Sequence, residues 1–525
     1  MAEKKNVYKK NTEKVKTARK PFKGEASRKS VAGNPQKRTG VKENGNDKSA
    51  AVKKSRCPYF KKCGACQMID TPYKKQLNLK HARLAELLEP YTKVESFIGM
   101  EKPEHYRCKV HAVFSHDRKG NPISGIYKEG SHEVVPVESC LLEDQKADAI
   151  IASIRGMLRS FKIKTYDEDN GFGLLRHVLI RIGRYSGEVM VVLVTVSPIF
   201  PSKNNFVKAL RKEHPEITTI VLNVNDKQTS MILGDKEKPL YGPGFIYDTC
   251  CGMKFKISPK SFYQVNPVQT ELLYKTAIDM ADFSGDEIAL DCYSGVGTIG
   301  IIASPHVKEV ISVELNGDAV KDAILNAKIN EVKNITFYKN DATKFMQQMA
   351  DSGDKADVVF MDPPRSGSTI EFINSMINLS PKKIVYISCS PDSLARDLEF
   401  ITKGGYKVKK AIPVDMFPFT RSIETVCLLS KLHEAKHHVN VKVDMDELDL
   451  TSAEAKATYK EIEEWVQEHY GFHVTNLNIA QVKQKHGIIE RENYNKPKSE
   501  NSRQPGCPEE KVKAIEDALR HFQMI

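Results

Sequence analysis

The chain has 525 residues, which is enough for two to four domains with several hydrophobic cores. Hydrophobic residues make up 40% and charged residues 28%, values near those of globular proteins, so composition excludes a short peptide or a wholly unfolded chain. The net charge of +13 indicates a polyanionic partner, but residues 1–55 alone hold 17 Lys and Arg against 5 Asp and Glu, which leaves +1 for the rest.

Cysteine usage and hydropathy point to a reducing, aqueous compartment. Eleven cysteines, an odd number in a long chain, do not form the pattern of a secreted disulfide scaffold. The longest apolar run, Val189–Val196, is far shorter than the ~18 residues that a membrane-spanning helix needs. We therefore expect a cytoplasmic protein with no membrane segment, and the sequence indicates no obligate protein partner.

The first segment, residues 1–55, is expected to be a disordered basic arm. It has almost no periodic apolar pattern, so folding it would not repay the lost entropy. Such an arm can bind nucleic-acid phosphates non-specifically through counterion release. The alternative is a tail that only keeps the protein soluble.

Residues 56–255 predict a mixed, mostly β domain. Runs rich in β-branched residues alternate with Gly, Asn and Pro turns, which is typical of strands. A one-sided antiparallel sheet would fit these runs. They cover residues 111–117, 125–137, 177–196 and 218–226.

Four cysteines of this domain are candidate ligands of a metal group. Cys57, Cys63 and Cys66 lie in the sequence CPYFKKCGAC, and Cys140 follows 74 residues later. Four thiolates suit a tetrahedral zinc ion or an iron–sulfur cluster, and spacing alone does not decide. Three clustered cysteines with a distant fourth are more typical of a cluster. We assign Cys108, which lies between them, to a strand.

Residues 256–432 change to an alternation of strands and helices, which predicts a doubly wound α/β domain with a largely parallel sheet. After Asn316, small and apolar residues recur at helical spacing. The predicted strands lie in residues 287–295, 308–315, 356–364 and 382–390.

Residues 433–525 predict a charged, helical C-terminal extension. Thr451–Glu454 has the pattern of a capping box, and the helix after it carries the only tryptophan, Trp465. A second helix is predicted in NIAQVKQKHG and a last one after Pro508. The helix pair has some likeness to a helix-turn-helix, but a simple appended helical subdomain is favoured.

A glycine-rich turn between a predicted strand and helix is the first sign of a ligand site. It runs from Asp291 to Gly300, and Gly295 lets the backbone approach a bound molecule. Glu314 ends the next strand, 19 residues after Gly295, where a carboxylate can accept both hydroxyls of a ribose. The turn suits a dinucleotide as well as a methyl donor.

The sequence Asp362-Pro-Pro-Arg365 separates these two alternatives. An acidic residue before two stiff prolines is typical of enzymes that methylate nucleic-acid bases. Enzymes that methylate an exocyclic amine usually place an aromatic residue after the prolines, whereas this chain has Arg365. The target is therefore expected to be a ring carbon.

Methylation at carbon 5 of uracil needs a nucleophile at carbon 6 and a base. Cys389 lies between a strand and a turn, so its thiolate is suited to covalent addition. The alternative is an inert, buried cysteine, the class to which we assign Cys292 and Cys427. Glu424 begins a strand after an apolar loop, where burial would raise its pKa and make it the base. Its alternative role is an ion pair with Arg421.

These motifs, in this order, resemble those of the SAM-dependent RNA uracil-5-methyltransferases of bacteria. The likeness extends from Cys57 to about Leu429. It implies a class I SAM-dependent methyltransferase domain in which Gln264, Tyr293 and Asp362 contact the donor, S-adenosylmethionine (SAM).

The resemblance also implies that Glu314 binds the ribose of SAM, that Cys389 is the nucleophile and that Glu424 is the base. The branch that modifies 23S ribosomal RNA carries a four-iron, four-sulfur cluster on the same cysteine pattern. The branch that modifies transfer RNA typically lacks it. A uridine of 23S rRNA is therefore the expected target, although many members begin with a small β-barrel where this chain has its basic arm.

Three alternatives stay open from the sequence. One is a transfer-RNA uracil-5-methyltransferase. Another is a non-catalytic iron–sulfur protein that binds RNA or assists ribosome assembly. The third, a nicotinamide-dependent oxidoreductase, shares the glycine-rich turn but gives no role to Asp362, Cys389 or Glu424.

Overall fold

The computed structural model describes residues 55–128, 131–227, 231–432, 459–486 and 508–522. They form two compact units, which divide between Lys431 and Leu432. Among these residues, no helix combines the length and apolar character needed to cross a bilayer. The predicted basic arm, except its last residue, and the predicted capping box at Thr451–Glu454 lie outside the described residues.

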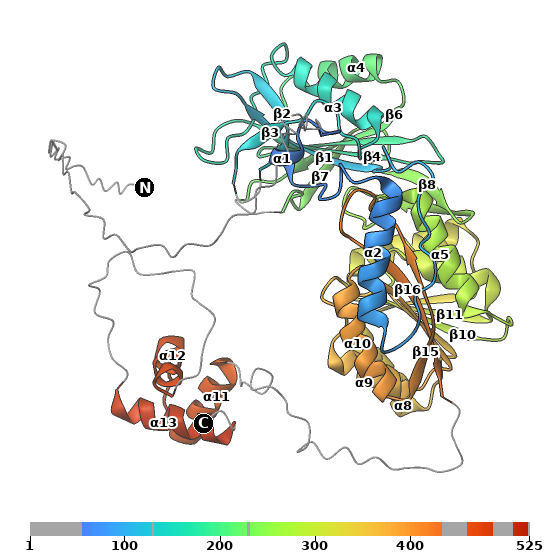
Figure 1. Cartoon of the computed structure of the whole chain (residues 1–525). Coiled ribbons are helices and arrows are strands. Elements are labelled where there is room, and N and C mark those ends of the chain that lie inside the picture. Colours follow the sequence, from blue (N-terminus) through green and yellow to red (C-terminus); the bar gives the residue numbers. More distant parts are fainter. Residues whose placement is uncertain (1–54, 129–130, 228–230, 433–458, 487–507, 523–525) are drawn as a thin grey trace, which may run out of the picture. The chain divides into compact units, whose positions relative to one another are not determined.

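The first part of the larger unit is built on a sheet of seven strands in the order β3-β2-β1-β4-β5-β6-β7. The helices α3 (Gln145–Met157) and α4 (Lys203–Glu213) cover one face (Figure 1). The strands are β1 (Lys109–His116), β2 (Pro122–Tyr127), β3 (Val134–Pro136), β4 (Leu175–Ile182), β5 (Val189–Thr195), β6 (Ile217–Val224) and β7 (Lys236–Tyr241).

The expectation of a one-sided antiparallel sheet is wrong for this part. β5 and β6 are parallel, and every residue of β4 and β5 is buried. Leu193 packs toward α3 and α4, whereas Met190 packs into the core that the sheet shares with the following domain. The unbroken apolar sequence of β5 is the pattern of a strand with both faces covered. Cys108 lies directly before β1 rather than in a strand.

Several short elements connect the two parts of the unit. α1 (Phe60–Cys63) ends at Cys63, the second of the three clustered cysteines, and α2 (Tyr73–Leu88) follows it. Although α2 precedes the first sheet in sequence, Leu84 and Leu88 pack into the core of the second sheet, beside β15 and β16 in Figure 1. A hairpin of β8 (Ile246–Cys250) and β9 (Met253–Ile257) leads into the second part.

The second sheet also has seven strands, in the order β12-β11-β10-β13-β14-β16-β15, and only β16 runs antiparallel to its neighbours. The strands are β10 (Ile288–Cys292), β11 (Glu309–Glu314), β12 (Ile335–Lys339), β13 (Val358–Met361), β14 (Lys383–Ser388), β15 (Tyr406–Val414) and β16 (Glu424–Lys431).

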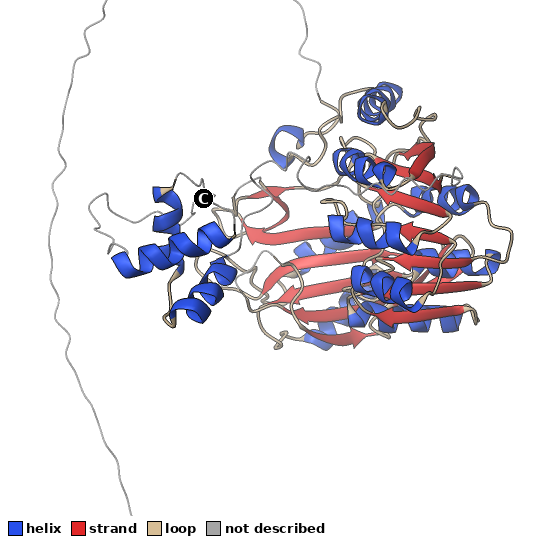
Figure 2. Ribbon diagram, turned by 90° about the horizontal axis from the view of Figure 1, so that it is seen from below, coloured by secondary structure: helices blue, strands red, loops and turns tan. Residues whose placement is uncertain are grey.

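Helices cover both faces of this sheet (Figure 2). α5, α6 and α7 pack on one face, and α2, α8, α9 and α10 pack on the other. This arrangement confirms the predicted doubly wound α/β domain. The helix bounds are α5 (Pro267–Ala281), α6 (Thr298–Ala303), α7 (Gly317–Ile329), α8 (Ala342–Ser352), α9 (Ile370–Leu379) and α10 (Pro391–Lys403), with a short 3₁₀ turn at Ser304–His306.

The described residues of the smaller unit form the helices α11 (Tyr459–Tyr470), α12 (Asn476–Lys485) and α13 (Glu509–His521), which confirms the three predicted there. Its core includes Ile462, Val466 and Leu519. Trp465 stacks against the ring of His469, with centroids 4.1 Å apart.

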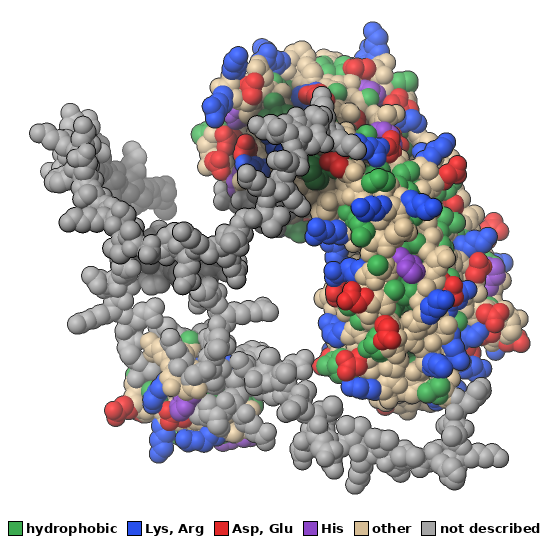
Figure 3. Space-filling model, viewed as in Figure 1, with side chains coloured by type: hydrophobic (Ala, Val, Ile, Leu, Met, Phe, Trp, Pro, Cys, Tyr) green, Lys and Arg blue, Asp and Glu red, His purple; other side chains and the backbone are tan. Residues whose placement is uncertain are grey.

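Charges of both signs are interspersed over the visible face of the larger unit (Figure 3). This agrees with the near-zero net charge of the chain after residue 55. A single-sign field over this face is therefore not what attracts a polyanion.

Two alanine substitutions test whether both faces of β5 are covered. Met190→Ala and Leu193→Ala change opposite faces, and each is expected to lower the free energy of unfolding by about 2–5 kcal/mol, because each leaves a cavity in a packed core. Urea denaturation measures the change. Exposed Lys238→Ala is the control, with a change within about 0.5 kcal/mol. A neutral Met190→Ala would mean that this face is open to solvent.

Candidate active site

The register of the second sheet brings the predicted site residues to one edge. β10 and β13 are parallel with Cys292 opposite Met361, so Tyr293 and Asp362 emerge side by side. β14 and β16 are antiparallel with Ser388 opposite Thr425. Because Cys389 follows Ser388 and Glu424 precedes Thr425, the candidate nucleophile and base face each other.

The turn after β10 is held in an unusual backbone conformation. Tyr293, Gly295 and Gly297 have φ values of 62°, 56° and 79°, in the left-handed region. The N–H of Gly295 donates to Glu314 Oε2 at 2.9 Å, which fixes the carboxylate at the end of β11. A Cβ at Gly300 would lie 2.6 Å from Ser312 Oγ, so this close approach requires glycine.

All seven residues predicted for catalysis and SAM binding line one cavity of about 890 Å³. They come from the ends of five strands and from the segment between β9 and α5. The residues are Gln264, Tyr293, Gly295, Glu314, Asp362, Cys389 and Glu424. The predictions of Cys292 and Cys427 as buried cysteines are confirmed, since neither is exposed.

Cys389 is a half-buried thiol in the free protein. Burial and the nearby carboxyl groups of Glu424 and Asp362 raise its pKa to about 11, while Arg365 opposes this shift. Little of the thiol is therefore ionised near neutral pH.

Glu424 is 5% exposed, and burial, followed by the charge of Asp362, raises its pKa well above the ordinary value. The cation that acts on it is Arg365 rather than Arg421, the partner in the alternative role. Once deprotonated, a carboxylate in such surroundings is a stronger base than one in water.

Two further carboxyl groups lie beside the glycine-rich turn. Burial raises the pKa of Asp362 to about 7, and it does the same for Asp291. Asp291 accepts a hydrogen bond from the N–H of Gly300 at 2.9 Å, so it supports the turn from beneath. A ligand with positive charge would favour the ionised form of these groups.

The segment before α5 supplies one wall of the cavity. Arg181 on β4 is buried and donates hydrogen bonds to the backbone oxygens of Pro259 and Ser261, which fixes the start of this segment. The side chain of Gln264 hydrogen bonds to Tyr274. Phe262, which was not predicted as a site residue, also lines the cavity and is 68% exposed.

Phe417 also lines the cavity and was not predicted as a site residue. It belongs to the apolar segment that precedes Glu424. An exposed or half-buried aromatic side chain in a cavity can stack on a base. The sequence signal that could have identified them is an aromatic residue in a predicted loop shortly before a predicted site residue, Gln264 for Phe262 and Glu424 for Phe417.

The four predicted ligand cysteines line a second cavity of about 280 Å³. Cys57, Cys63, Cys66 and Cys140 are each half-buried, and the N–H of Leu142 donates to Cys140 Sγ at 3.4 Å. Arg107 also lines the cavity, and its buried Nε atom has no hydrogen-bond partner. Arg107 also interacts with the carboxyl group of Glu143, which lines the same cavity. Four thiols, an N–H donor to sulfur and a nearby guanidinium fit an anionic iron–sulfur cluster.

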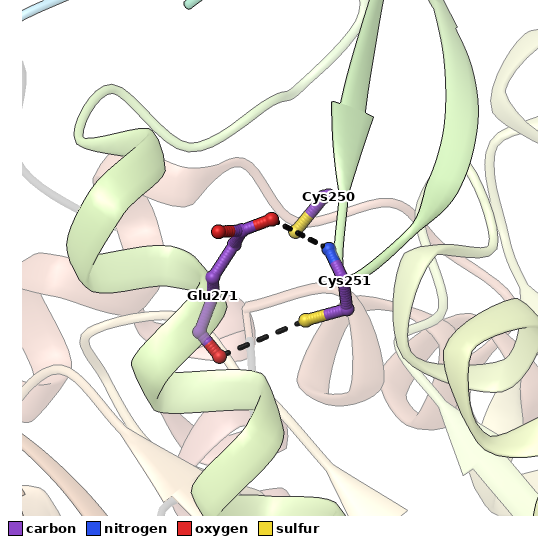
Figure 4. Close-up of side chains that lie close together, drawn as sticks. All are labelled: Cys250, Cys251 and Glu271. Atoms are coloured by element: carbon purple, nitrogen blue, oxygen red, sulfur yellow. Dashed lines mark hydrogen bonds between the residues drawn. The ribbon is translucent and has the colours of Figure 1, made fainter. Parts of the chain in front are cut away.

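A second group of thiols lies on the hairpin, where Cys250 and Cys251 stand beside Glu271 of α5 (Figure 4). Both carboxylate oxygens of Glu271 already accept hydrogen bonds, one from the N–H of Cys251 at 2.8 Å and one from the hydroxyl of Tyr185. This group is therefore explained as a hydrogen-bonded link between the hairpin and the helix.

Comparison with protein families gives one match that covers most of the chain. The family model described as tRNA (Uracil-5-)-methyltransferase matches residues 72–432. This range includes Cys140 and all seven predicted site residues that line the larger cavity. It begins after Cys57, Cys63 and Cys66.

Similar proteins carry related names. The chain is 40% identical to an uncharacterized RNA methyltransferase of Halalkalibacterium halodurans, over 71% of this chain and 82% of that protein. It is 39% identical to one of Caldanaerobacter subterraneus, over 72% and 84%. Among solved structures, the tRNA (uracil-54, C5)-methyltransferase of Pyrococcus abyssi in complex with S-adenosyl-L-homocysteine is similar, with a TM-score of 0.60 and 26% identity over 69% of this chain and 85% of that one.

The raised pKa of Cys389 predicts a pH dependence for its reaction with a small alkylating agent. Its pKa of about 11 means that the thiolate fraction, and with it the alkylation rate, should rise about tenfold per pH unit between about pH 7 and 9. Mass spectrometry of the peptide that contains Cys389 measures this rate. A plateau below about pH 9 would reveal a thiolate already formed in the free protein and would contradict this assignment.

Proposed function

The chain belongs to the tRNA (Uracil-5-)-methyltransferase family of SAM-dependent RNA uracil-5-methyltransferases, and we propose that its substrate is a specific uridine of 23S ribosomal RNA. The observation that carries the choice of RNA is the cavity lined by four cysteines. Cysteines in this pattern resemble those of the ribosomal-RNA branch of the family.

In the proposed mechanism, the target uridine enters the larger cavity unpaired and stacks beside Phe262 or Phe417. The Cys389 thiol gives its proton to solvent water, and its sulfur forms a bond to ring carbon 6. The electron pair of the carbon 5–carbon 6 double bond then becomes available at carbon 5 for methyl transfer. SAM, when bound, supplies the electrophilic methyl group on a cationic sulfur.

The second half of the reaction releases the product. Glu424 takes the proton from carbon 5, the double bond re-forms, and the carbon–sulfur bond breaks to return the Cys389 thiolate. Glu424 lies opposite Cys389 across the β14–β16 pair, which is where a base must lie to act on the neighbouring carbon of the ring. Gln264, Tyr293, Gly295, Glu314 and Asp362 are the proposed donor-binding residues.

Cys57, Cys63, Cys66 and Cys140 are the proposed ligands of a four-iron, four-sulfur cluster. Such a cluster would supply structural cross-linking between α1 and the segment after β3 rather than electron transfer. Arg107 would balance its negative charge.

A transfer-RNA substrate is the second candidate. The observation that favours it is the likeness to the Pyrococcus abyssi enzyme, whose name specifies tRNA uracil 54.

The choice of RNA is tested by mapping 5-methyluridine in cells that lack the gene. Mass spectrometry of nuclease fragments should find a 5-methyluridine missing from 23S rRNA, with that of transfer RNA unchanged. The wild-type gene should restore it, and a Cys389→Ala gene should not, because the variant lacks the nucleophile. A loss confined to transfer RNA would contradict the proposal and favour the second candidate.

The cluster is tested by analysis of anaerobically purified protein. We expect about four iron and four sulfide ions per chain and a broad thiolate-to-iron absorption band. Cys66→Ser should lose most of the iron, whereas Cys251→Ala, a change at a half-buried cysteine outside the cavity, should keep it. One tightly bound zinc ion without sulfide would contradict the assignment.

A further inference from the structure

The segment that joins β15 to β16 runs from Asp415 to Ile423 and ends directly at Glu424. Its conformation is set by contacts with other parts of the unit. Five consecutive carbonyl oxygens of this segment accept hydrogen bonds from distant residues. The donors are Gln269 Nε2 to the oxygen of Asp415 (3.2 Å), Asn266 Nδ2 to that of Met416 (3.0 Å), Lys80 Nζ to that of Phe417 (3.2 Å), the Tyr106 hydroxyl to that of Pro418 (3.2 Å) and the N–H of Met68 to that of Phe419 (2.9 Å).

The side chain of Asp415 forms a buried ion pair with Lys80 of α2. Lys80 Nζ lies 2.6 Å from Asp415 Oδ1, and the two side chains are 2% and 0% exposed. The hydroxyl of Tyr73, also on α2, donates to Asp415 Oδ2 at 2.8 Å. Because a buried charge is tolerated only when it is paired and hydrogen-bonded, this contact ties α2 to one position on the segment.

Two phenylalanines of the segment show what the contacts hold in place. Phe417 lines the active-site cavity. Phe419 is fully buried with a φ of 67°, a conformation that a non-glycine residue keeps only when its surroundings enforce it. Its N–H donates to Gln76 Oε1 of α2 at 2.9 Å. The strained turn is therefore stabilised from α2 as well.

We propose that Lys80 is a positioning residue for the product-release step, an inference that rests on the proposed roles of Cys389 and Glu424. Lys80 holds both the charge of Asp415 and the carbonyl oxygen of Phe417, and so it sets the backbone path that delivers Glu424 to the cavity. Cys389 lies between β14 and α10, outside this segment. Loss of Lys80 should therefore impair proton removal more than thiol addition.

The experiment compares full-length Lys80→Met with wild-type protein on unmodified substrate RNA and SAM. The rate of 5-methyluridine formation should fall about 10–100-fold, with KM for SAM within about twofold, because the donor-binding turn lies elsewhere. A covalent protein–RNA species carrying the transferred methyl group should accumulate on denaturing gels, since release is slowed. Lys75→Met, at an exposed position of the same helix, should behave as wild type.

A second variant covers the possibility that Lys80→Met does not fold, because it leaves Asp415 buried and unpaired. Lys80→Met with Asp415→Asn removes both charges and also the hydrogen bond from Lys80 to the oxygen of Phe417, which then keeps only its local donors on Thr420, so the adduct should again accumulate. Normal turnover in a folded variant would overturn the inference. It would also be overturned if SAM affinity, the amount of adduct and the amount of product all fell to the same extent. If the wild-type protein itself forms no 5-methyluridine in RNA, the proposed function fails first.

Discussion

The antiparallel pairing of β14 with β16 is the interaction on which the rest of the active site depends. Residues on a strand alternate between the two faces of a sheet, so a shift of one residue would turn a side chain to the opposite face. The observed register places Cys389 opposite Glu424, and the parallel pair of β10 and β13 places Tyr293 beside Asp362. Buried core residues on both faces of the sheet fix this register, which means that ordinary packing determines the catalytic geometry.

The electrostatics of the cavity suit a resting enzyme that stays unreactive until both ligands bind. With a pKa of about 11, Cys389 is ionised in about one molecule in ten thousand at neutral pH. Glu424 and Asp362 are likewise shifted toward their neutral forms by burial. A cationic donor would oppose this bias for all three groups, because a nearby positive charge favours the charged form of each. The two halves of the reaction are thereby coupled to occupancy of the donor site.

The sequence predicted the strand ends and their motifs because such signals are local. Each motif can be recognised within about ten residues of sequence. They are a glycine-rich turn, an acidic residue before two prolines and a cysteine after an apolar strand. The position of α2 was not predictable, because the pair of Lys80 and Asp415 joins residues 335 positions apart and leaves no periodic trace. The parallel pairing of β5 with β6 was missed for a related reason, since strand direction depends on the crossover through α4 rather than on composition.

The most direct test of the account is whether Cys389 becomes covalently bound to RNA. Full-length protein is incubated with SAM and substrate RNA that contains 5-fluorouridine, whose fluorine Glu424 cannot remove as a proton. Mass spectrometry after protease and nuclease digestion should find a methylated fluorouridine attached to the peptide that contains Cys389, and Cys389→Ala should form no adduct. Absence of an adduct in the wild-type protein, or its attachment to another cysteine, would contradict the account.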